Sequence, residues 1–189
     1  MRVERLSERI NGPLKFIPDR AYHDTRGVFV ELFRLGDLRE ELGKELSFVQ
    51  SNFSLSQPFV LRGMHYQSDA QAKLFSCIHG YVYQALVDMR EGSPTFGEWV
   101  GVSLKSEEFA SVYVPPGFAN GFVTLATGAI VHYQLTTPFD AAKECGVKYD
   151  DPGVGIGWPL GFGASLKVSK KDREQPELAK AVRWRRTRG

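Results

Sequence analysis

The chain has 189 residues, a length that a single all-β domain can fill. Hydrophobic residues make up 42% of the chain and charged residues 24%, a balance typical of a folded soluble protein that excludes disorder along the whole chain. The positive charge is concentrated from residue 177 onward, where five basic residues stand against one acid. A basic patch would rest on this tail alone, so the composition does not indicate a nucleic-acid-binding protein.

Cysteine usage and the N-terminal sequence indicate a cellular location. Cys77 and Cys145 belong to no Cys-x-x-Cys pair, and unpaired thiols are typical of a reducing compartment. The first eight residues lack the apolar core of a signal peptide, and no run of about 18 apolar residues is present. We therefore expect a cytoplasmic protein that does not contact the membrane.

Short apolar runs separated by turn residues follow one another through the middle of the chain. In chain order, the sequence predicts strands at residues 28–33, 73–78, 81–88, 99–104, 111–114, 122–126 and 130–137. Tight turns are predicted at His79-Gly80 and Thr127-Gly128, and Pro115-Pro116-Gly117 ends the strand before it.

Two segments have helical patterns. Leu35, Leu38, Leu42 and Leu46 recur at steps of three and four, which places them on one face of a short helix. Residues 176–184 begin with a proline and predict a second helix.

The spacing of the strands, roughly 8–12 residues, predicts the fold class. Many short strands with turn residues between them are typical of an all-β jelly roll or another double-sheet barrel. No linker or repeat divides the chain, so we expect one domain over residues 1–189, with 176–189 as a basic C-terminal tail. The residues from Tyr149 onward are expected to wrap around the barrel.

The four histidines do not form a recognisable metal site. A cupin-type metal site requires a His-x-His pair, and His23, His65, His79 and His132 form none, so no metal is predicted. His65 stands out by its neighbours, because Arg62, Gln67 and Lys73 lie close to it in sequence. Cations that converge on a cavity indicate an anionic ligand such as a phosphate or pyrophosphate. A histidine that is simply hydrogen-bonded in the interior is the alternative.

Two other segments offer polar side chains to such a ligand. Gln50 and Asn52 are separated by one residue, so they share one face of a strand and suit a polar ring or a sugar. Arg26 and Glu31 add a second candidate segment. The sequence has no glycine-rich phosphate loop, so side chains are expected to hold the phosphate.

An ordered series of motifs resembles the dTDP-4-dehydrorhamnose 3,5-epimerases and their relatives that act on other 4-keto nucleotide sugars. The resemblance covers about residues 15–175. The motifs are Asp24-Thr25-Arg26-Gly27-Val28-Phe29, Phe48-Val49-Gln50-Ser51-Asn52, Leu61-Arg62-Gly63-Met64-His65-Tyr66-Gln67, Gln71-Ala72-Lys73-Leu74, Asp88-Met89-Arg90, Ser93-Pro94-Thr95-Phe96-Gly97, Pro115-Pro116-Gly117-Phe118-Ala119-Asn120-Gly121-Phe122, Asp151-Pro152 and Trp158-Pro159.

The resemblance implies a cupin-type jelly roll, an epimerase activity without a cofactor, and a homodimer formed by exchange of N-terminal strands. It implies that His65 is the base, Tyr133 the acid on the opposite face, and Asp172 the carboxylate that orients His65. Lys73 suits the stabilisation of an enolate beside the keto group, because a cation in a dry site offsets the developing charge. The residues implied to hold the nucleotide sugar are Arg26, Glu31, Gln50, Asn52, Arg62, Lys73, Glu144 and Lys171.

Two positions depart from the family pattern. Asn120 stands where the family usually has histidine, and it can donate and accept hydrogen bonds but cannot act as a base near neutral pH. We assign Asn120 to substrate binding. Pro138-Phe139 replaces tyrosines of the family, one of which stacks on the thymine base.

Three functions follow as alternatives. The first is an epimerase that inverts C3, C5 or both in a 4-keto-6-deoxy nucleotide sugar, which is expected to be dTDP-linked. The second is a single-centre epimerase or keto-isomerase on a related nucleotide sugar. The third is a cupin that binds such a sugar without catalysis, and the presence of both members of a proton-transfer pair argues against it.

Overall fold

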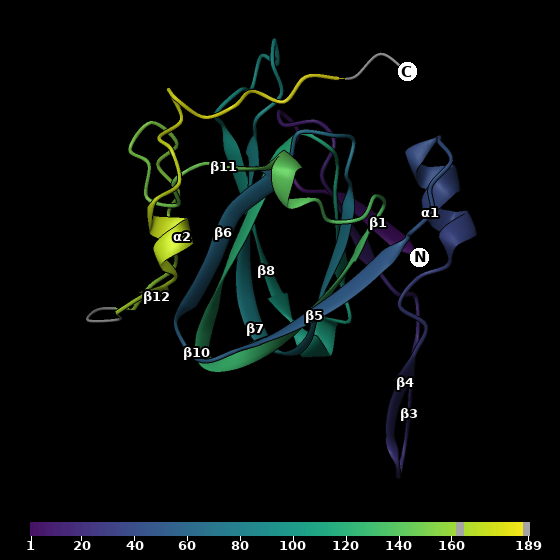
Figure 1. Ribbon diagram of the computed structural model, residues 1–189. Helices are drawn as coiled ribbons and strands as arrows, with labels where there is room; N and C mark the ends of the chain where they lie inside the picture. Colours follow the sequence, from purple (N-terminus) through teal and green to yellow (C-terminus); the bar gives the residue numbers. More distant parts are fainter. Residues whose placement is uncertain (162–164, 187–189) are drawn as a thin grey trace.

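The computed structural model describes residues 1–161 and 165–186, and its strands form two layers that face each other across a common core (Figure 1). Two long antiparallel strands, β7 (Lys73–Asp88) and β10 (Phe118–Leu135), contribute one half to each layer. The remaining main strands extend the two layers from these halves. This arrangement confirms the predicted all-β, cupin-type double-sheet jelly roll.

The first layer contains the start of β7, the end of β10 and four further strands. These are β1 (Arg2–Arg5), β2 (Leu14–Ile17), β5 (Gln50–Ser56) and β9 (Ser111–Val114). β9 pairs with β7 and links it to β2 and β1, whereas β5 pairs with β10 at the other side.

The second layer contains the end of β7, the start of β10 and four more strands. These are β6 (Val60–Gln67), β8 (Trp99–Lys105), β11 (Glu144–Gly146) and β12 (Lys167–Val168). β8 pairs with β7, and β6 pairs with β10 on one side and with β11 and β12 on the other. As a result, β6 lies within the second layer and faces the end of β10 and β5 in the first.

The two long strands bend where Gly80 and Gly128 meet. Both glycines have positive φ, 81° and 71°, and a Cβ on Gly80 would lie 2.2 Å from the carbonyl oxygen of Gly128. The predicted tight turns at His79-Gly80 and Thr127-Gly128 are therefore wrong, because both strands continue through these positions. The glycines allow close backbone contact at a bend where each strand passes from one layer to the other.

Both faces of the second half of β7 are buried. On the inner face, Val82 joins a cluster between the layers that includes Phe75 and Phe122, whose ring centroids are 5.4 Å apart. On the outer face, Ala85 packs beneath C-terminal residues that include Trp158. Described parts of the chain after residue 149, among them Val154, Trp158 and Trp184, thus pack along the outside of the second layer, as expected.

The helices are short. The predicted leucine face is confirmed for Leu35, Leu38 and Leu42 in α1 (Leu35–Leu42), where Leu38 is buried. The prediction is wrong for Leu46, because the helix ends at Gly43, which adopts a left-handed conformation with φ of 59°. The predicted helix at residues 176–184 is wrong: apart from a turn, the segment is irregular, and Trp184 forms a β-bridge with Arg90. The other helical segments are 3₁₀ turns η1 (Ser106–Glu108) and η2 (Ala141–Lys143) and the single-turn α2 (Lys170–Arg173).

A two-stranded hairpin, β3 (Ala21–Asp24) and β4 (Gly27–Val30), projects away from both layers (Figure 1). Its strands pair only with each other in the part of the chain that the structure describes. Tyr22 and Phe29 are 57% and 70% exposed on it, and their ring centroids lie 6.3 Å apart.

No helix within residues 1–161 and 165–186 has the length and apolarity needed to cross a bilayer. The last three residues of the predicted basic tail, including Arg188, lie outside the described residues.

Candidate functional site

A cavity of about 690 Å³ opens between the layers, and a smaller hollow of about 300 Å³ adjoins it. His65, Lys73 and Tyr133 line both spaces. Strands of both layers supply these side chains. Predicted site residues that line the larger cavity are Arg62, His65, Lys73, Asn120, Tyr133, Lys171 and Asp172. Those that line the smaller hollow are Gln50, Asn52, His65, Lys73, Tyr133 and Glu144.

His65 lies on β6 between two carboxylates. Its Nε2 atom is 2.6 Å from Oδ1 of Asp172, and its Nδ1 atom is 3.6 Å from Oε1 of Glu144. The imidazole is 28% exposed, whereas the Asp172 side chain is only 6% exposed. When Nε2–H donates to Asp172, Nδ1 is the ring atom that remains free to accept a proton.

The short helix α2 holds Asp172 beside His65. Ser169 caps this helix, because its hydroxyl accepts a hydrogen bond from the backbone N–H of Asp172 at 3.1 Å. Burial favours the neutral acid, but the hydrogen bonds from His65, Ser169 and the backbone of Gly63 outweigh it and lower the pKa of Asp172. Asp172 is therefore an ionised acceptor that fixes the orientation of the imidazole.

Lys73 brings a positive charge into the same space. Its ammonium group lies 3.5 Å from the carbonyl oxygen of His65, and burial lowers the pKa of Lys73 to about 8, although the nearby Glu144 opposes that shift. Glu144 itself forms a 2.5 Å ion pair with Lys171. Lys73 thus lacks an ion-pair partner of its own within the described chain, which leaves its charge available to an anion.

Tyr133 faces this group from the other layer. It lies on the part of β10 that pairs with β5, and its ring stacks on Phe75 with centroids 6.5 Å apart and planes at 15°. Burial raises the pKa of Tyr133, an effect that the charge of Arg62 only partly offsets, so the phenol keeps its proton at neutral pH. A proton donor and a proton acceptor therefore line one cavity from its two opposite walls.

Asn120 is held in one orientation by Gln84. The Nε2 atom of the fully buried Gln84 donates to Oδ1 of Asn120 at 2.6 Å. With its oxygen engaged, Asn120 presents its amide N–H groups to the cavity that it lines. The substitution of the family's histidine therefore leaves a hydrogen-bond donor at this position but removes a group that could titrate near pH 7.

Arg26 and Glu31 do not line the cavity that holds the other predicted residues. Arg26 lies at the tip of the β3–β4 hairpin and forms a 2.6 Å ion pair with Asp24, whereas Glu31 pairs with Arg34 at 2.6 Å. Within one chain, the sequence prediction that both residues join this site is therefore not met.

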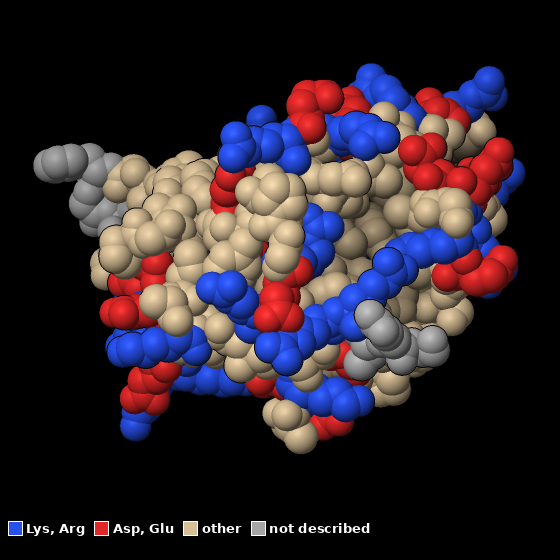
Figure 2. Space-filling view, turned by 90° about the horizontal axis from the view of Figure 1, so that it is seen from above, with Lys and Arg blue, Asp and Glu red and all other residues tan. Residues whose placement is uncertain are grey.

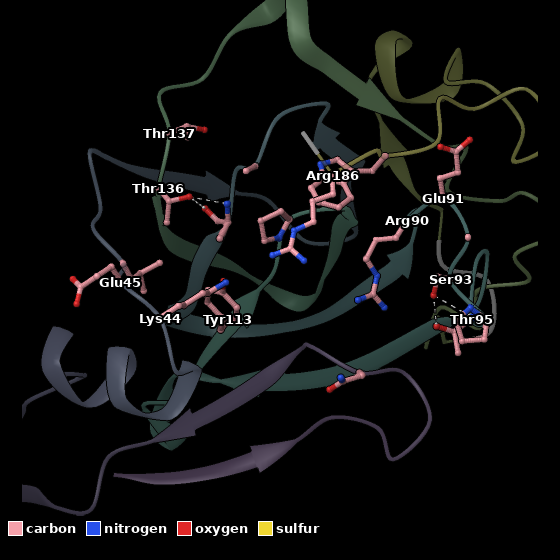
Figure 3. Close-up of a pocket in the computed structure, with 18 of the residues that line it drawn as sticks. Lys44, Glu45, Arg90, Glu91, Ser93, Thr95, Tyr113, Thr136, Thr137 and Arg186 are labelled. Atoms are coloured by element: carbon pink, nitrogen blue, oxygen red, sulfur yellow. Dashed lines mark hydrogen bonds between the residues drawn. The ribbon is translucent and has the colours of Figure 1, made fainter. Parts of the chain in front are cut away.

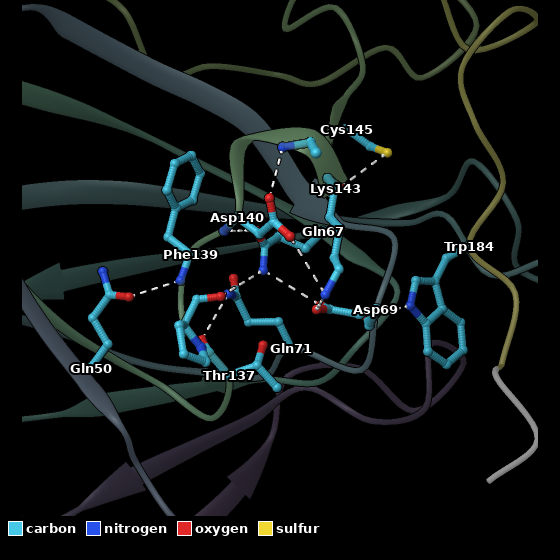
Figure 4. Close-up of polar contacts among 12 residues, drawn as sticks. Gln50, Gln67, Asp69, Gln71, Thr137, Phe139, Asp140, Lys143, Cys145 and Trp184 are labelled. Carbon is cyan, nitrogen blue, oxygen red and sulfur yellow. Dashed lines mark hydrogen bonds and ion pairs between the residues drawn. The ribbon is translucent and has the colours of Figure 1, made fainter.

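Three glutamines hold the segment at residues 137–140 along the rim of the smaller hollow (Figure 4). Gln67 accepts a hydrogen bond from the N–H of Asp140 at 2.7 Å and donates to the carbonyl of Pro138 at 3.3 Å. Gln71 donates to the carbonyl of Thr137 at 3.1 Å, and Gln50 accepts from the N–H of Phe139 at 2.8 Å.

The roles of Gln67 and Gln71 were absent from the predicted site. Both residues stand in motifs of the family resemblance, and each points to a backbone segment about 70 residues away. Because that contact is long-range, only their place beside His65 and Lys73 could have signalled it. Phe139, which stands where the family has a tyrosine, is 51% exposed on this rim.

Comparison with known proteins places the chain in a family. The family model for dTDP-4-dehydrorhamnose 3,5-epimerase matches residues 8–180. A dTDP-4-dehydrorhamnose 3,5-epimerase from Sinorhizobium fredii is 41% identical over 168 residues, which cover 87% of this chain and 85% of the relative.

Solved structures agree with this match. A dTDP-6-deoxy-D-glucose 3,5-epimerase from Legionella pneumophila, in complex with dTDP-4-keto-L-rhamnose, superposes with a TM-score of 0.90 at 38% identity over 100% of both chains. A 4-keto-6-deoxy sugar epimerase from the novobiocin biosynthetic gene cluster of Streptomyces spheroides has a TM-score of 0.87 at 34% identity, covering 95% of this chain and 88% of its own. The chain therefore belongs to the dTDP-4-dehydrorhamnose 3,5-epimerase family.

Proposed function

We propose that this epimerase inverts both C3 and C5 of a 4-keto-6-deoxy sugar carried on dTDP, with His65 as base and Tyr133 as acid. The observation that carries the proposal is the placement of these two groups on opposite walls of one cavity, with the cation of Lys73 between the layers. Inversion of a carbon requires removal of a proton from one face and delivery to the other. The dTDP and keto-sugar parts of the substrate come from the Legionella relative, whose complex contains dTDP-4-keto-L-rhamnose.

The reaction begins when Nδ1 of His65 takes the proton from a carbon beside the C4 ketone. The electron pair of the broken C–H bond moves into a C3–C4 or C4–C5 double bond, and the C4 oxygen becomes an enolate. Lys73 stabilises that oxygen because its charge acts inside a cavity, where water screens it less than at the protein surface. Asp172 orients the imidazole and stabilises the imidazolium that forms.

Reprotonation then completes the inversion. Tyr133 donates its phenolic proton from the opposite wall of the cavity. The enolate electrons form the new C–H bond with that proton. His65 gives its proton to solvent, and Tyr133 regains one from solvent, so both groups are reset for the second carbon. No cofactor takes part in these steps.

The remaining cavity residues suit the nucleotide. Arg62 is exposed toward the cavity and Lys171 lies on its rim, so both can pair with the diphosphate. Asn52, Gln50 and the ring of Phe139 border the smaller hollow, where they suit the sugar and the thymine.

The homodimer that the family resemblance implies would bring Arg26 and Glu31 to a site. The hairpin that carries Arg26 exposes Tyr22 and Phe29, and the outer face of β5 exposes Phe53 and Leu55, 73% and 69% accessible. Apolar surfaces of this kind mark interfaces between chains. We propose that each hairpin lies across β5 of the partner and supplies its arginine there.

Two inactive variants test this exchange. Arg26→Ala and His65→Ala should each form inactive or nearly inactive homodimers, because one lacks a ligand for the substrate and the other lacks the base. When the two proteins are mixed, unfolded and refolded, heterodimers contain one intact site, so activity should recover to about a quarter of the wild-type value. An absence of recovery, with heterodimers verified by native mass spectrometry, would contradict the exchange.

Substitution of Gln67 tests whether the rim that carries Phe139 binds substrate. Gln67→Met removes the two hydrogen bonds by which this side chain holds residues 138 and 140. At about 1 kcal/mol each, KM should rise about ten- to thirtyfold while kcat changes less than twofold. The control is Tyr81→Phe, which removes an exposed hydrogen bond to Ser103 outside both hollows and should leave both constants unchanged. A loss confined to kcat in the first variant would mean that the rim does not bind substrate.

One experiment separates the candidate functions. The enzyme is incubated with dTDP-4-dehydro-6-deoxyglucose in heavy water, and the sugar is examined by proton NMR. Deuterium at both C3 and C5, with inverted configurations, is the expected result. Deuterium at one carbon would indicate a single-centre epimerase, and deuterium at neither would overturn the epimerase mechanism.

We also propose that residues 1–189 act as one domain in the cytoplasm. The free thiols of Cys77 and Cys145 support a reducing compartment. C-terminal residues pack on the outer face of β7, which supports a single unit.

A further inference from the structure

A second, larger cavity of about 920 Å³ lies outside the catalytic site (Figure 3). It shares no lining residue with the two catalytic hollows. Its wall is formed by the loop after α1, the end of β9, the loop after β7 and the C-terminal residues Trp184 and Arg186. In the space-filling view from above, the surface is hollowed, and Lys and Arg side chains border the hollow (Figure 2).

A single strand separates this cavity from the catalytic site. Ala72 lines the second cavity, whereas its neighbours Gln71 and Lys73 line the catalytic hollow. Alternation along the chain therefore directs adjacent side chains into different cavities. Thr136 is tied to this point, because its hydroxyl accepts a hydrogen bond from the N–H of Ala72 at 2.8 Å.

Some charges of the second cavity are neutralised within the protein. Arg90 forms a two-pronged contact with the buried carboxylate of Asp88, with its Nε at 2.9 Å and its Nη2 at 2.7 Å. Arg9 pairs with Glu98 at 2.6 Å. These two arginines are therefore structural and contribute little free charge to a ligand.

The acids of the lining are neutralised in the same way. Glu91 pairs with Arg185 at 2.7 Å, and Glu45 pairs with Arg39 at 3.3 Å. Among the described residues, the lining cations that form no ion pair are Lys44 and Arg186. Their side chains extend into the same space in Figure 3. The cavity thus has an excess of two positive charges once its internal ion pairs are counted.

Two buried hydroxyl groups of the lining also lack a partner. Tyr113 is 1% exposed, and its hydroxyl oxygen forms no hydrogen bond with the described residues; the hydroxyl of Thr137 is buried and unpaired as well. A buried polar group without a partner is costly, and such groups commonly bind a ligand or water. The ammonium of Lys44 lies 5.3 Å from the centre of the Tyr113 ring, so a cation and an unpaired hydroxyl group are adjacent.

An apolar surface completes the lining. Trp184 and Pro116 contribute a flat aromatic ring and an apolar ring to the wall. The indole N–H of Trp184 donates to the carbonyl of Asp69 at 2.8 Å, which fixes the ring in place. A fixed aromatic ring beside two cations suits a ligand that has a planar base and a phosphate group.

We propose that this cavity is a second site for a nucleoside diphosphate, with the phosphates bound by Lys44 and Arg186 and the base packed on Trp184. The volume lies within the range of roughly 300–1,000 Å³ found for small-molecule sites. The site is independent of the epimerase chemistry, since none of its residues belongs to the catalytic cavity.

Equilibrium dialysis with dTDP tests the proposal. The double variant Lys44→Gln, Arg186→Gln should bind one equivalent of dTDP fewer per chain than the wild type, or bind that equivalent at least tenfold more weakly. Its kcat/KM for the keto sugar should stay within twofold of the wild-type value. Both side chains are exposed, so the variant should fold normally, which circular dichroism can check.

Lys105→Gln is the matched control. Lys105 also lies over a tyrosine ring, at 5.5 Å from the centre of Tyr81, but does not line the cavity, so its removal should leave the stoichiometry unchanged. Equal stoichiometry and affinity in the double variant and the wild type would overturn the second site. Equal affinity of this site for dTDP and for thymidine, which has no phosphate, would also overturn it. A failure of the epimerase assay would not alter either readout, so the two proposals can fail separately.

Discussion

Replacement of His65 by alanine is expected to lower the rate of deuterium exchange at C3 and C5 about a thousandfold, the range by which a positioned general base accelerates proton transfer. The imidazole is the group that accepts the proton. The neighbouring carboxylates keep other partners once it is gone, because Glu144 pairs with Lys171 and the carboxylate of Asp172 accepts a hydrogen bond from the backbone N–H of Gly63. Exchange is measured by proton NMR of the keto sugar in heavy water, with dTDP binding followed by calorimetry.

Binding and a second histidine provide the controls for this experiment. The dTDP affinity of His65→Ala should change less than threefold, because the nucleotide is held by other cavity residues. His79→Ala, which removes an exposed histidine at the bend of β7, should retain full exchange. If His65→Ala exchanges protons at the wild-type rate, another group is the base and the proposed chemistry is wrong.

The strand pattern of the fold could be predicted from the sequence, but its two bends could not. Alternating and continuous apolar runs identify β7 and β10 because a strand buries its side chains with a period of two. Gly80 and Gly128 are turn signals when read locally. Their actual use depends on the contact between them, and residues 48 positions apart in the chain give no local sign of it.

The prediction of a helix over residues 176–184 was wrong for a similar reason. Proline at its start and good helix formers after it favour a helix in isolation. In the folded protein, the N–H of Leu178 donates to Asp151 and Trp184 pairs with Arg90, so tertiary contacts hold the segment in an irregular path. Intrinsic helix propensity of a few tenths of a kcal/mol per residue is too small to oppose such contacts.

Most of the proposed site came from the family resemblance, and the structure brings those residues to one cavity from distant parts of the chain. His65 and Asp172 are 107 residues apart yet form a 2.6 Å contact. Arg26 does not reach this cavity within its own chain, because its position depends on a partner that one sequence cannot describe. The rim glutamines were missed because their partners are backbone atoms, which carry no residue identity.

Replacement of Lys73 by methionine is expected to slow catalysis strongly and to stabilise the fold. Loss of a group that stabilises a developing oxyanion costs about a hundredfold to a thousandfold in kcat. Burial lowers the pKa of Lys73 from 10.5 to about 8, so the protonated lysine destabilises the folded state at neutral pH. At about 1.4 kcal/mol per pKa unit, and with allowance for water in the cavity, Lys73→Met should gain roughly 1–3 kcal/mol at pH 7.

The pH dependence of that gain separates an effect of charge from one of packing. Below pH 8, Lys73 is protonated in both the folded and the unfolded chain, and its full cost is present. Between about pH 8 and 10.5, the folded chain loses the proton while the unfolded chain keeps it, so wild-type stability rises relative to the variant. The advantage of Lys73→Met, measured by urea unfolding, should therefore shrink as the pH rises through this range.

Lys105→Met, a substitution of an exposed lysine, should show no pH-dependent advantage in the same assay. A Lys73→Met gain that stays constant from pH 7 to 10.5 would assign the effect to packing and contradict a lowered pKa. A variant that is both more stable and inactive would instead show that the fold retains Lys73 at a cost in stability. That cost has a chemical explanation, because a cation with an incomplete set of partners is attracted to the enolate oxygen more strongly than one already paired.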